Sequence, residues 1–333
     1  MSAVDVIVPC YRYGHFLRQC VESVLTQSGP SVRVLIIDDA SPDNTSEVAS
    51  ELAREDCRVT FRKHTTNKGH ISTYNEGIEW VAADYMLLLS ADDYLLPNAF
   101  RRATDLMDKH PEMAFTFGNA IRLDPHATRT IRSVKVSGDF RILKGLDFIR
   151  ISGASNVVPS PTAVTRTCFQ KRVGGYRPEL PHSGDMEMWL RLAANGSVGV
   201  INSCQAVYRR HSSNMSLEYM ANSFFPEILQ RKTALDLFFT DCGHLLPHPK
   251  SLEKKFQLSL ARIAVGLASS ALADGQNAVA EKLSGFAVSM CPAVRFSPSW
   301  AKFLWTREVK CRATSLRRKF VKASDSRSIV DNS

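Results

Sequence analysis

The chain contains 333 residues, of which 44% are hydrophobic and 23% are charged, and its formal net charge is +9. This composition is typical of a folded globular protein and excludes a disordered chain. The length allows one large domain with an appendage, or two modest domains.

The excess of basic residues is concentrated near the C-terminus. Residues 302–322 contain eight Lys and Arg side chains against a single acid, Glu308. This concentration favours a basic tail over a basic active-site face. A basic tail is attracted to anionic partners such as phospholipid head groups. The basic residues do not surround a recognisable nucleic-acid-binding module, so we expect no nucleic-acid partner.

The cysteines and the apolar segments bear on the cellular compartment. The eight cysteines are scattered without two-residue spacings, which argues against a zinc knuckle, and we expect reduced thiols. A strand is expected from Val4, which leaves no room for a signal peptide. The longest apolar run, Ile263–Ala273, is shorter than the roughly 18 residues that cross a bilayer. We therefore expect a cytoplasmic protein.

Strand and helix signals alternate along the first part of the chain. Short β-branched or continuous apolar runs predict strands, and apolar residues at helical spacing predict helices. The strands are expected at 4–8, 32–37, 59–62 and 85–89, and the helices at 16–27, 44–54 and 71–82. This order predicts an α/β fold with a mostly parallel, Rossmann-like sheet flanked by helices, in which ligands bind beyond the carboxyl ends of the strands.

The second half of the chain is less regular and then becomes helical. Glycines and prolines divide residues 115–165 into short strands and loops, and a helix at 186–195 precedes a strand at 199–208. Two alanine-rich segments, 261–273 and 278–290, suggest a helical hairpin. We expect a catalytic domain over 1–215, a helical C-terminal region over 216–323 and a disordered tail over 324–333.

Paired acidic residues follow two of the predicted strands. Asp38 and Asp39 come after the second strand, and Asp92 and Asp93 come after the fourth. Such pairs are costly unless a positive group joins them, and a hard divalent cation or a nucleobase N–H donor would serve. The alternative is that these residues only form turns and helix caps.

Four motifs in order resemble one family. They are Val6–Tyr11 (VIVPCY), Ile37–Ser41 (IDDAS), the segment from Asn67–Gly69 (NKG) through Asn75–Ile78 (NEGI), and Leu89–Asp93 (LSADD). Their order and spacing are similar to those of the GT-A-fold glycosyltransferases of family 2, over about residues 1–215. The helical remainder lies outside the resemblance.

The resemblance implies a nucleotide-sugar site. It assigns nucleotide binding to Pro9, Tyr11, Asp38, Asp39, Asn67, Lys68 and Asp92. It implies that Asp93 ligates Mg²⁺ or Mn²⁺, with His211 as a further metal ligand or a diphosphate contact. Asn67 and Lys68 are equally compatible with a plain turn. The family most often has an acid where Ser90 stands, which leaves the division of roles between Asp92 and Asp93 open.

The same resemblance assigns the catalytic base to Asp185. This residue falls in the first turn of a predicted helix, where the helix dipole favours an ionised carboxylate. The family usually has Glu where Gly184 stands. Glu187 is the rival base, although it can instead pair with Arg191 one turn later, and Asp185 can instead cap the helix.

These features predict an inverting, metal-assisted glycosyltransferase of polysaccharide biosynthesis. The expected donor is a nucleotide sugar, most simply UDP-linked, and the expected acceptor is a glycan or a lipid-linked sugar. The basic, aromatic C-terminal helix predicts peripheral contact with an anionic membrane. The alternatives are a catalytically inactive sugar-nucleotide-binding or scaffold protein and a nucleotidyltransferase, although the first strand lacks the Gly-rich loop typical of the latter.

Overall fold

The computed structural model describes residues 2–124, 127–131, 134, 137–211, 214 and 224–309. The chain divides into two compact units, one formed by Met1–Glu218 with Thr233–Pro249 and the other by Tyr219–Lys232 with Lys250–Ser333. The predicted disordered tail at 324–333 and the basic residues beyond 309 lie outside the described residues.

The first unit is built on one mixed sheet, to which the described residues contribute ten strands. The strands are β1 (Ala3–Cys10), β2 (Ser31–Asp38), β3 (Val59–Lys63), β4 (Tyr85–Leu88), β5 (Tyr94–Leu95), β6 (Met113–Asp124), β7 (Ala127–Ile131), β8 (Phe140–Leu143), β9 (Val164–Arg166) and β10 (Ser197–Arg209). Their order across the sheet is β3-β2-β1-β4-β9-β6-β10-β5, with β7 on β6 and β8 on β10.

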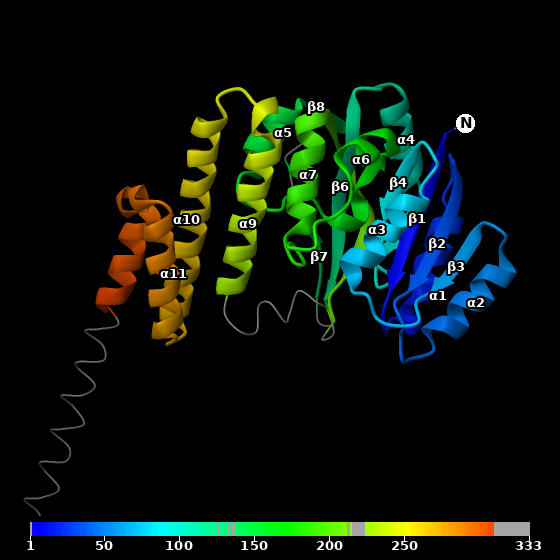
Figure 1. The fold of residues 1–333 in the computed structure, drawn as a ribbon, viewed down its shortest axis with the longest axis horizontal. Helices are drawn as coiled ribbons and strands as arrows, with labels where there is room; N and C mark the ends of the chain where they lie inside the picture. Colours follow the sequence, from blue (N-terminus) through cyan, green and yellow to red (C-terminus); the bar gives the residue numbers. More distant parts are fainter. Residues whose placement is uncertain are drawn as a thin grey trace, which may run out of the picture. The chain divides into compact units, whose positions relative to one another are not determined.

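Helices cover both faces of this sheet, as the alternating pattern predicts. The helices are α1 (Gly14–Leu25), α2 (Thr45–Glu55), α3 (His70–Trp80), α4 (Ala99–Asp108), α5 (Gly145–Ser152), α6 (Thr167–Val173) and α7 (Gly184–Asn195), with a short 3₁₀ turn, η1, at Ser160–Thr162. Helices α3, α6 and α7 lie over one face (Figure 1). Side chains of α1, α2 and α4 belong to the main core cluster on the other face.

Alternate residues of β1 serve the two faces. Val6 and Val8 join the core cluster with Leu17 of α1. Ile7 points the other way, and a Cβ at Gly77 of α3 would lie 2.3 Å from its Cγ2. Helix α3 therefore approaches the sheet closely only because residue 77 is glycine. The strands β3, β2, β1 and β4 are all parallel, in agreement with the sequence prediction.

The far half of the sheet is where the structure departs from the sequence prediction. Residues 113–124 form one long strand, β6, rather than short pieces separated at Gly118. A Cβ at Gly118 would lie 2.6 Å from Cγ of Gln205, so this glycine marks close packing against β10 and not a break. Strand β9 runs antiparallel to both β4 and β6, which makes the whole sheet mixed.

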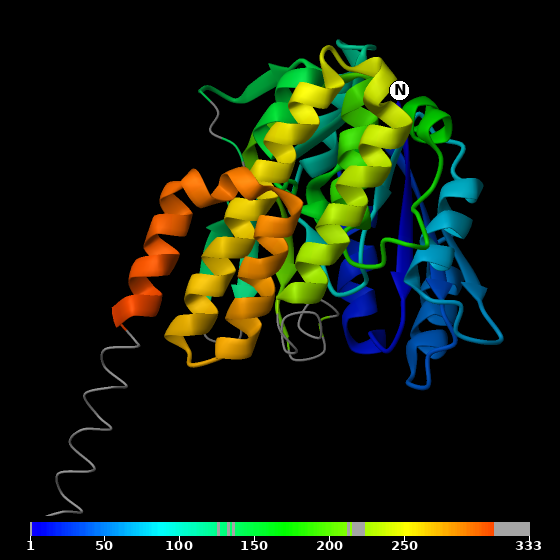
Figure 2. The ribbon, with the colours of Figure 1, turned by 60° about the vertical axis from the view of Figure 1, so that its left-hand side comes forward.

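The second unit is helical. Helices α10 (Pro249–Ala273) and α11 (Asn277–Met290) run side by side as the predicted hairpin (Figure 2). Gly275, at φ +82°, ends α10 in the left-handed conformation that favours glycine. A 3₁₀ turn, η3 (Pro292–Phe296), leads to a last helix at 298–309.

Two further helical elements complete the described chain. Helix α9 (Phe225–Cys242) and the 3₁₀ turn η2 (Gly243–Leu245) precede α10. Helix α10 has 25 residues and is, by length and composition alone, long and apolar enough to cross a bilayer. The apolar run expected from the sequence, Ile263–Ala273, is only the C-terminal part of this helix. Half of its most apolar window is buried within the structure.

Candidate active site

The carboxyl ends of the first strands meet at one edge of the sheet. Cys10 at the end of β1 is in register with Asp38 at the end of β2. The N–H of Leu89, just after β4, donates to Ile7 O of β1 at 2.9 Å. The acidic pairs at the ends of β2 and β4 therefore emerge on either side of β1, at the edge where parallel sheets bind ligands.

Asp38 and Asp39 differ in what they do at this edge. Asp38 is fully buried, and its two oxygens accept hydrogen bonds from Ser41 N at 2.8 Å and Ser46 Oγ at 2.5 Å. Both acceptors of Asp38 thus stabilise the turn into α2. The sequence assigned Asp38 to the nucleotide, and the structure places its carboxylate inside the protein, behind that turn.

Asp39 organises the loop that follows β3. Its Oδ1 accepts from Lys68 N at 2.7 Å, and its Oδ2 accepts from Gly69 N at 2.9 Å. His64 Nδ1 lies 2.7 Å from Oδ1, and His64 Nε2 lies 2.9 Å from Glu76 Oε2. The carboxylate is 4% exposed and fixes residues 67–69 at the rim of the site.

The other predicted nucleotide residues border the same edge. The Tyr11 side chain is 42% exposed just beyond β1, and Pro9 is half-buried within that strand. Lys68 Nζ lies 3.3 Å from Glu76 Oε2. Asn67 Oδ1 accepts from Gly69 N at 3.0 Å, which is a turn contact. Tyr11 thus presents an exposed aromatic ring just beyond β1.

Asp93 is an interior carboxyl group. It is 2% exposed, and its Oδ1 accepts from Arg209 N at 2.9 Å. Burial raises the pKa of Asp93 well above its ordinary value, and the neighbouring charge of Asp92 raises it further. The Asp93 side chain therefore ties the loop after β4 to the end of β10.

Asp92 faces the second half of the site. Its Oδ2 lies 3.1 Å from His211 Nε2 and accepts from Asn214 Nδ2 at 3.1 Å. The structure therefore brings His211 to Asp92, whereas the sequence paired this histidine with Asp93 as metal ligands. Asn214 was not expected from the sequence, although it lies in the stretch that supplied His211.

Arg209 supplies positive charge beside the acidic pair. Its guanidinium lies over the rings of Phe16 and Tyr94, at 4.7 Å and 4.8 Å from their centroids. It also donates to Asp92 O at 2.9 Å. Two aromatic faces and a carbonyl fix its position, so that it offsets part of the negative charge at this edge.

The donor atoms of Asp92 and His211 fit a divalent cation that also binds phosphate. Among the described residues, no three His, Cys, Asp or Glu side chains converge to hold a metal by themselves. Asp92 Oδ2 and His211 Nε2 lie 3.1 Å apart as a hydrogen-bonded pair, and each atom is of a type that can bind a divalent cation. A cation of this class uses few protein ligands and completes its shell with water and substrate phosphates.

Asp185 lies in the first turn of α7, as predicted. Its Oδ1 accepts from the Tyr176 hydroxyl at 3.0 Å, and its Oδ2 accepts from Ser160 Oγ. The N-cap of α7 is Ser183. The carboxylate contacts two hydroxyls from elsewhere in the fold.

Glu187, the rival base, is fully buried between two arginines. Its Oε1 lies 2.7 Å from Arg191 Nε and 3.0 Å from Arg177 Nε. Oε2 lies 2.9 Å from Arg191 Nε, so both carboxylate oxygens are engaged inside the protein. Glu187 therefore makes the helix pair that the sequence offered as its alternative role.

The Tyr74 hydroxyl of α3 is influenced by the charges of both Asp185 and Asp92. Burial raises the pKa of the Tyr74 hydroxyl, and the negative charges of Asp185 and Asp92 raise it further. Tyr74 therefore lies within electrostatic range of both carboxylates. The sequence gave no signal for Tyr74, Tyr176 or Ser160, because each is a single residue in a segment without a motif.

Solved structures of two known proteins are similar to the fold of this chain. The structure is similar to that of TarS from S. aureus in complex with UDP-GlcNAc, with a TM-score of 0.57, 14% identity, and coverage of 86% of this chain and 91% of that one. It is also similar to the mannosyltransferase PcManGT from Pyrobaculum calidifontis in complex with GDP-Man and Mn²⁺, with a TM-score of 0.53, 17% identity, and coverage of 91% and 85%. At these identities the likeness establishes the fold, which is GT-A.

Sequence comparisons match the N-terminal part of the chain to one family. Residues 5–156 match the model of glycosyl transferase family 2. The uncharacterized glycosyltransferase EpsJ of Bacillus subtilis is 31% identical over 31% of this chain and 29% of its own length. An uncharacterized glycosyltransferase of Rickettsia conorii is 25% identical over 65% of this chain and 35% of its own length. The chain carries a family 2 glycosyltransferase domain, and its matches span about a third of the length of these relatives.

Proposed function

We propose that the protein is a glycosyltransferase that moves a sugar from a nucleoside diphosphate donor to a hydroxyl of a glycan or lipid-linked sugar, with inversion. The observation that carries this proposal is the Asp92–His211 pair just beyond the carboxyl end of β4. Asp39 follows β2 at the same edge of the sheet, and Asp185 lies in the first turn of α7. The charges of Asp185 and Asp92 both raise the pKa of the Tyr74 hydroxyl. The likeness to TarS, solved with UDP-GlcNAc, and to PcManGT, solved with GDP-Man and Mn²⁺, supports a nucleotide-sugar donor.

The donor half of the site comprises the ends of β1 and β2 and the loop after β4. Tyr11 stacks on the base, and Asp39 accepts a hydrogen bond from a base N–H while it holds Lys68 and the loop backbone in place. We assign metal binding to Asp92 with His211, and a structural role to Asp93. A bound Mg²⁺ or Mn²⁺ neutralises the charge that develops on the leaving diphosphate.

The acceptor half is centred on Asp185. The acceptor oxygen attacks the anomeric carbon from the face opposite the diphosphate, the bond from that carbon to the diphosphate oxygen breaks, and the acceptor proton passes to Asp185. One displacement of this kind inverts the configuration. The position of Asp185 in the first turn of α7 favours the ionised form that accepts a proton.

A donor panel tests the proposal. UDP-, GDP- and dTDP-sugars are incubated with Mg²⁺, with Mn²⁺ and with EDTA, and release of nucleoside diphosphate is measured for the wild type, Asp92→Ala and Asp185→Asn. We expect slow metal-dependent turnover of one donor, lost in Asp92→Ala. Release of pyrophosphate from a nucleoside triphosphate would instead identify a nucleotidyltransferase. Binding of a sugar nucleotide without turnover, in the presence of a panel of glycan and lipid-linked sugar acceptors, would identify an inactive binding protein.

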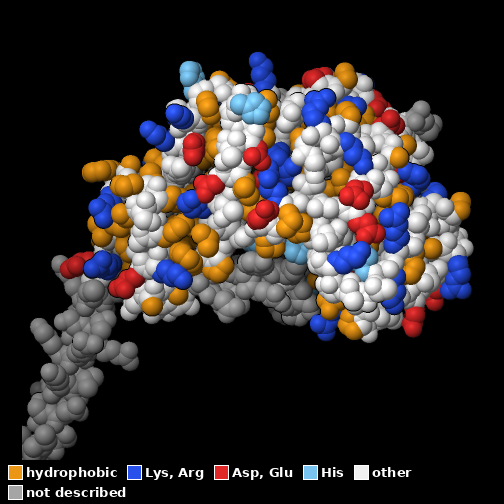
Figure 3. All heavy atoms as spheres, viewed as in Figure 1, with side chains coloured by type: hydrophobic (Ala, Val, Ile, Leu, Met, Phe, Trp, Pro, Cys, Tyr) orange, Lys and Arg blue, Asp and Glu red, His pale blue; other side chains and the backbone are white. Residues whose placement is uncertain are grey.

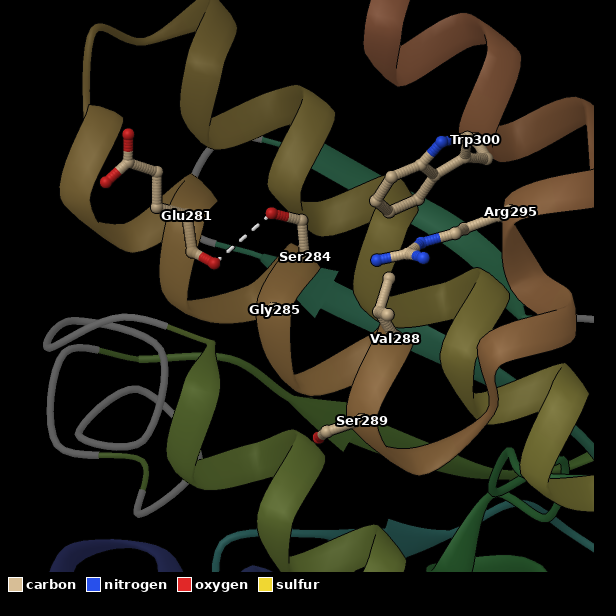
Figure 4. A pocket seen from close by; sticks show the side chains of 7 residues that line it. All are labelled: Glu281, Ser284, Gly285, Val288, Ser289, Arg295 and Trp300. Atoms are coloured by element: carbon tan, nitrogen blue, oxygen red, sulfur yellow. Dashed lines mark hydrogen bonds between the residues drawn. The ribbon is translucent and has the colours of Figure 1, made fainter.

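The second unit exposes an aromatic and basic surface. Phe296 is 93% exposed, and Trp305 of the helix at 298–309 is 69% exposed. A groove of about 430 Å³ beside them is lined by Glu281, Ser284, Gly285, Val288, Ser289, Arg295 and Trp300 (Figure 4). On the face shown in Figure 3, hydrophobic side chains gather among Lys and Arg over the region of α10 and α11.

We propose that this surface binds the anionic face of a membrane. Residues 295–309 carry Arg295, Lys302 and Arg307 against Glu308, and residues 310–322 add six more Lys and Arg without an acid. Exposed aromatics among cations are typical of segments that lie at a lipid headgroup surface. Such a placement suits a cytoplasmic enzyme with a lipid-linked acceptor, with residues 1–215 as catalytic domain and residues 216–323 as the helical region.

A further inference from the structure

Each oxygen of the Asp185 carboxylate has its own hydroxyl partner. Tyr176 OH donates to Oδ1 at 3.0 Å, and Ser160 Oγ donates to Oδ2. Tyr176 comes from the loop before α7 and Ser160 from η1, so two separate segments fix one side chain. With both oxygens engaged, the carboxylate has one orientation and retains a lone pair on each oxygen.

Tyr176 is itself held by Asn75, a residue of the Asn75–Ile78 motif that has no other role in the site. Asn75 Oδ1 accepts from Tyr176 N at 2.7 Å, and Asn75 Nδ2 donates to Tyr176 O at 2.8 Å. A Cβ at Gly175 would lie 2.4 Å from Asn75 Oδ1, so glycine permits this approach. The side-chain amide thus pairs with both backbone groups of Tyr176, as a neighbouring strand would.

The Tyr176 ring occupies the space beside Gly184. A Cβ at Gly184 would lie 3.1 Å from Tyr176 Cδ1, closer than an ordinary van der Waals contact. The ring is 6% exposed and packs edge-on against Tyr74, with centroids 5.3 Å apart. A long side chain at position 184 would displace the ring. Glycine at position 184 therefore leaves the space in which the Tyr176 ring lies while its hydroxyl donates to Asp185.

We infer that Tyr176 is a positioning residue that holds the Asp185 carboxylate in one orientation, and that Asn75 and Gly184 keep Tyr176 in place. This inference rests on the proposed role of Asp185 as base. A hydrogen bond donated to a carboxylate stabilises its charged form. Burial and then the charge of Asp185 raise the pKa of the Tyr176 hydroxyl, which keeps the hydroxyl protonated and able to donate.

Other titratable groups around this pair also bear on its charge. Tyr74 lies beside Tyr176 on α3, and the charge of Asp185 raises its pKa. Arg191 of α7 acts in the opposite direction on Tyr176 and lowers its pKa. Arg191 is already paired with Glu187 at 2.7 Å. Tyr176 is thus the titratable side chain that hydrogen-bonds directly to Asp185.

Tyr176→Phe tests the inference because it removes the hydroxyl and keeps the ring. The pH dependence of transfer is measured, and the Asp185 carboxyl is titrated by ¹³C NMR, with its signal assigned from Asp185→Asn. We expect the Asp185 pKa and the acid limb of the rate profile to rise by about one pH unit, the size expected for one hydrogen bond to a charged group. Donor affinity should stay unchanged. Ser160→Ala, which removes the other partner, should shift the pKa in the same direction.

Tyr85→Phe is the matched control. The Tyr85 hydroxyl is also buried and also donates to an aspartate, Asp108 Oδ1, at 2.6 Å. Tyr85→Phe should lower stability comparably and leave the Asp185 titration in place. An unmoved Asp185 pKa and acid limb in Tyr176→Phe would overturn the inference and leave the proposed function standing. Absence of transfer by the wild type would instead refute the function, while the carboxyl titration would still decide the role of Tyr176.

Discussion

Asp92 Oδ2 and His211 Nε2 lie 3.1 Å apart, although 119 residues separate them in the chain. Their proximity follows from the pairing of β5 with β10, which is antiparallel and joins Leu95 to Ala206. Asp93 contributes from the same turn by accepting the N–H of Arg209. One adjacent carboxylate therefore faces the site while the other secures the two segments that build it.

This relationship predicts opposite phenotypes for the two aspartates. Asp92→Asn should raise the metal concentration needed for activity and lower kcat by on the order of 10²–10³, because it removes a charged group at the diphosphate. Asp93→Asn should retain the acceptor for Arg209 N and leave the metal dependence unchanged. Activity is measured against Mn²⁺ concentration for both variants. A raised metal requirement in Asp93→Asn alone would restore the assignment that the sequence suggested.

The regular part of the fold was predictable from sequence, and the reasons are visible in individual elements. The β-branched runs of β1 and β2 and the helical spacing of α1 each carry their own periodicity. Strand β6 was missed because Gly118 resembles a break. That glycine is required by the Gln205 side chain, which lies on another strand and leaves no local signal.

The candidate site was predictable only where its residues stand in motifs. Asp92 and Asp185 are recognisable because each belongs to a motif at the end of a strand or the start of a helix. The partner of His211 is set by the register of β5 on β10, which no local pattern specifies. The interior position of Asp38 likewise depends on Ser46, which lies on the following helix.

Substitutions of Tyr11 and Asp38, both assigned to the nucleotide from the sequence, should have different effects. The first should weaken binding, and the second should lower stability. Tyr11→Ala should weaken nucleotide binding by about 1–3 kcal/mol, the contribution of one stacked base, with little effect on folding because the ring is 42% exposed. Asp38→Asn should instead lower the free energy of unfolding by about 1–3 kcal/mol, because one buried partner is left unsatisfied. Calorimetric titration with UDP and urea unfolding measure both. Equal loss of affinity in both variants would contradict this division.

Glu187 should prove to be structural. Glu187→Gln leaves Arg191, which is 5% exposed, without its buried counter-charge, and we expect a loss of about 3 kcal/mol or more in the free energy of unfolding. At temperatures where the variant is folded, the acid limb of its rate profile should coincide with that of the wild type. Asp185→Asn is the comparison, because it should abolish transfer and preserve stability. An acid limb that disappears in Glu187→Gln would make Glu187 the base.

The buried Asp5 of β1 should make the stability of the protein depend on pH in the acidic range. Burial acts to raise the pKa of Asp5, but hydrogen bonds from Arg33 and from the N–H groups of Ala82 and Ala83 outweigh it, so the pKa is lowered. A lowered pKa in the folded state stabilises the protein above the unfolded value of about 3.9. That contribution is lost as the pH falls through the folded pKa.

Asp5→Asn should therefore be less stable than the wild type at neutral pH. The difference should shrink below about pH 4, where the wild-type carboxyl becomes protonated in the unfolded chain. Urea unfolding from pH 3 to pH 7 measures the gap. A constant gap across this range would show that the charge of Asp5 does not contribute.

The exposed surface of the second unit should govern membrane binding. Phe296→Ala and Trp305→Ala each remove an exposed aromatic, and burial of one such side chain contributes about 1.5–3 kcal/mol, so each variant should bind anionic vesicles at least about tenfold more weakly. Flotation of the full chain with vesicles of phosphatidylglycerol and phosphatidylcholine measures this. Binding should weaken as salt rises and should vanish for phosphatidylcholine alone, because cations such as Arg295 and Lys302 contribute.

Ile151→Ala provides the control for the loss of an exposed apolar side chain, because Ile151 is 44% exposed on α5 in the other unit. It should bind vesicles as the wild type does. If Phe296→Ala and Trp305→Ala float like the wild type, the surface does not bind lipid. If instead they convert a dimer to a monomer in solution and leave vesicle binding unchanged, the surface is covered by a second copy of the chain, and the basic segment that follows residue 309 has another partner.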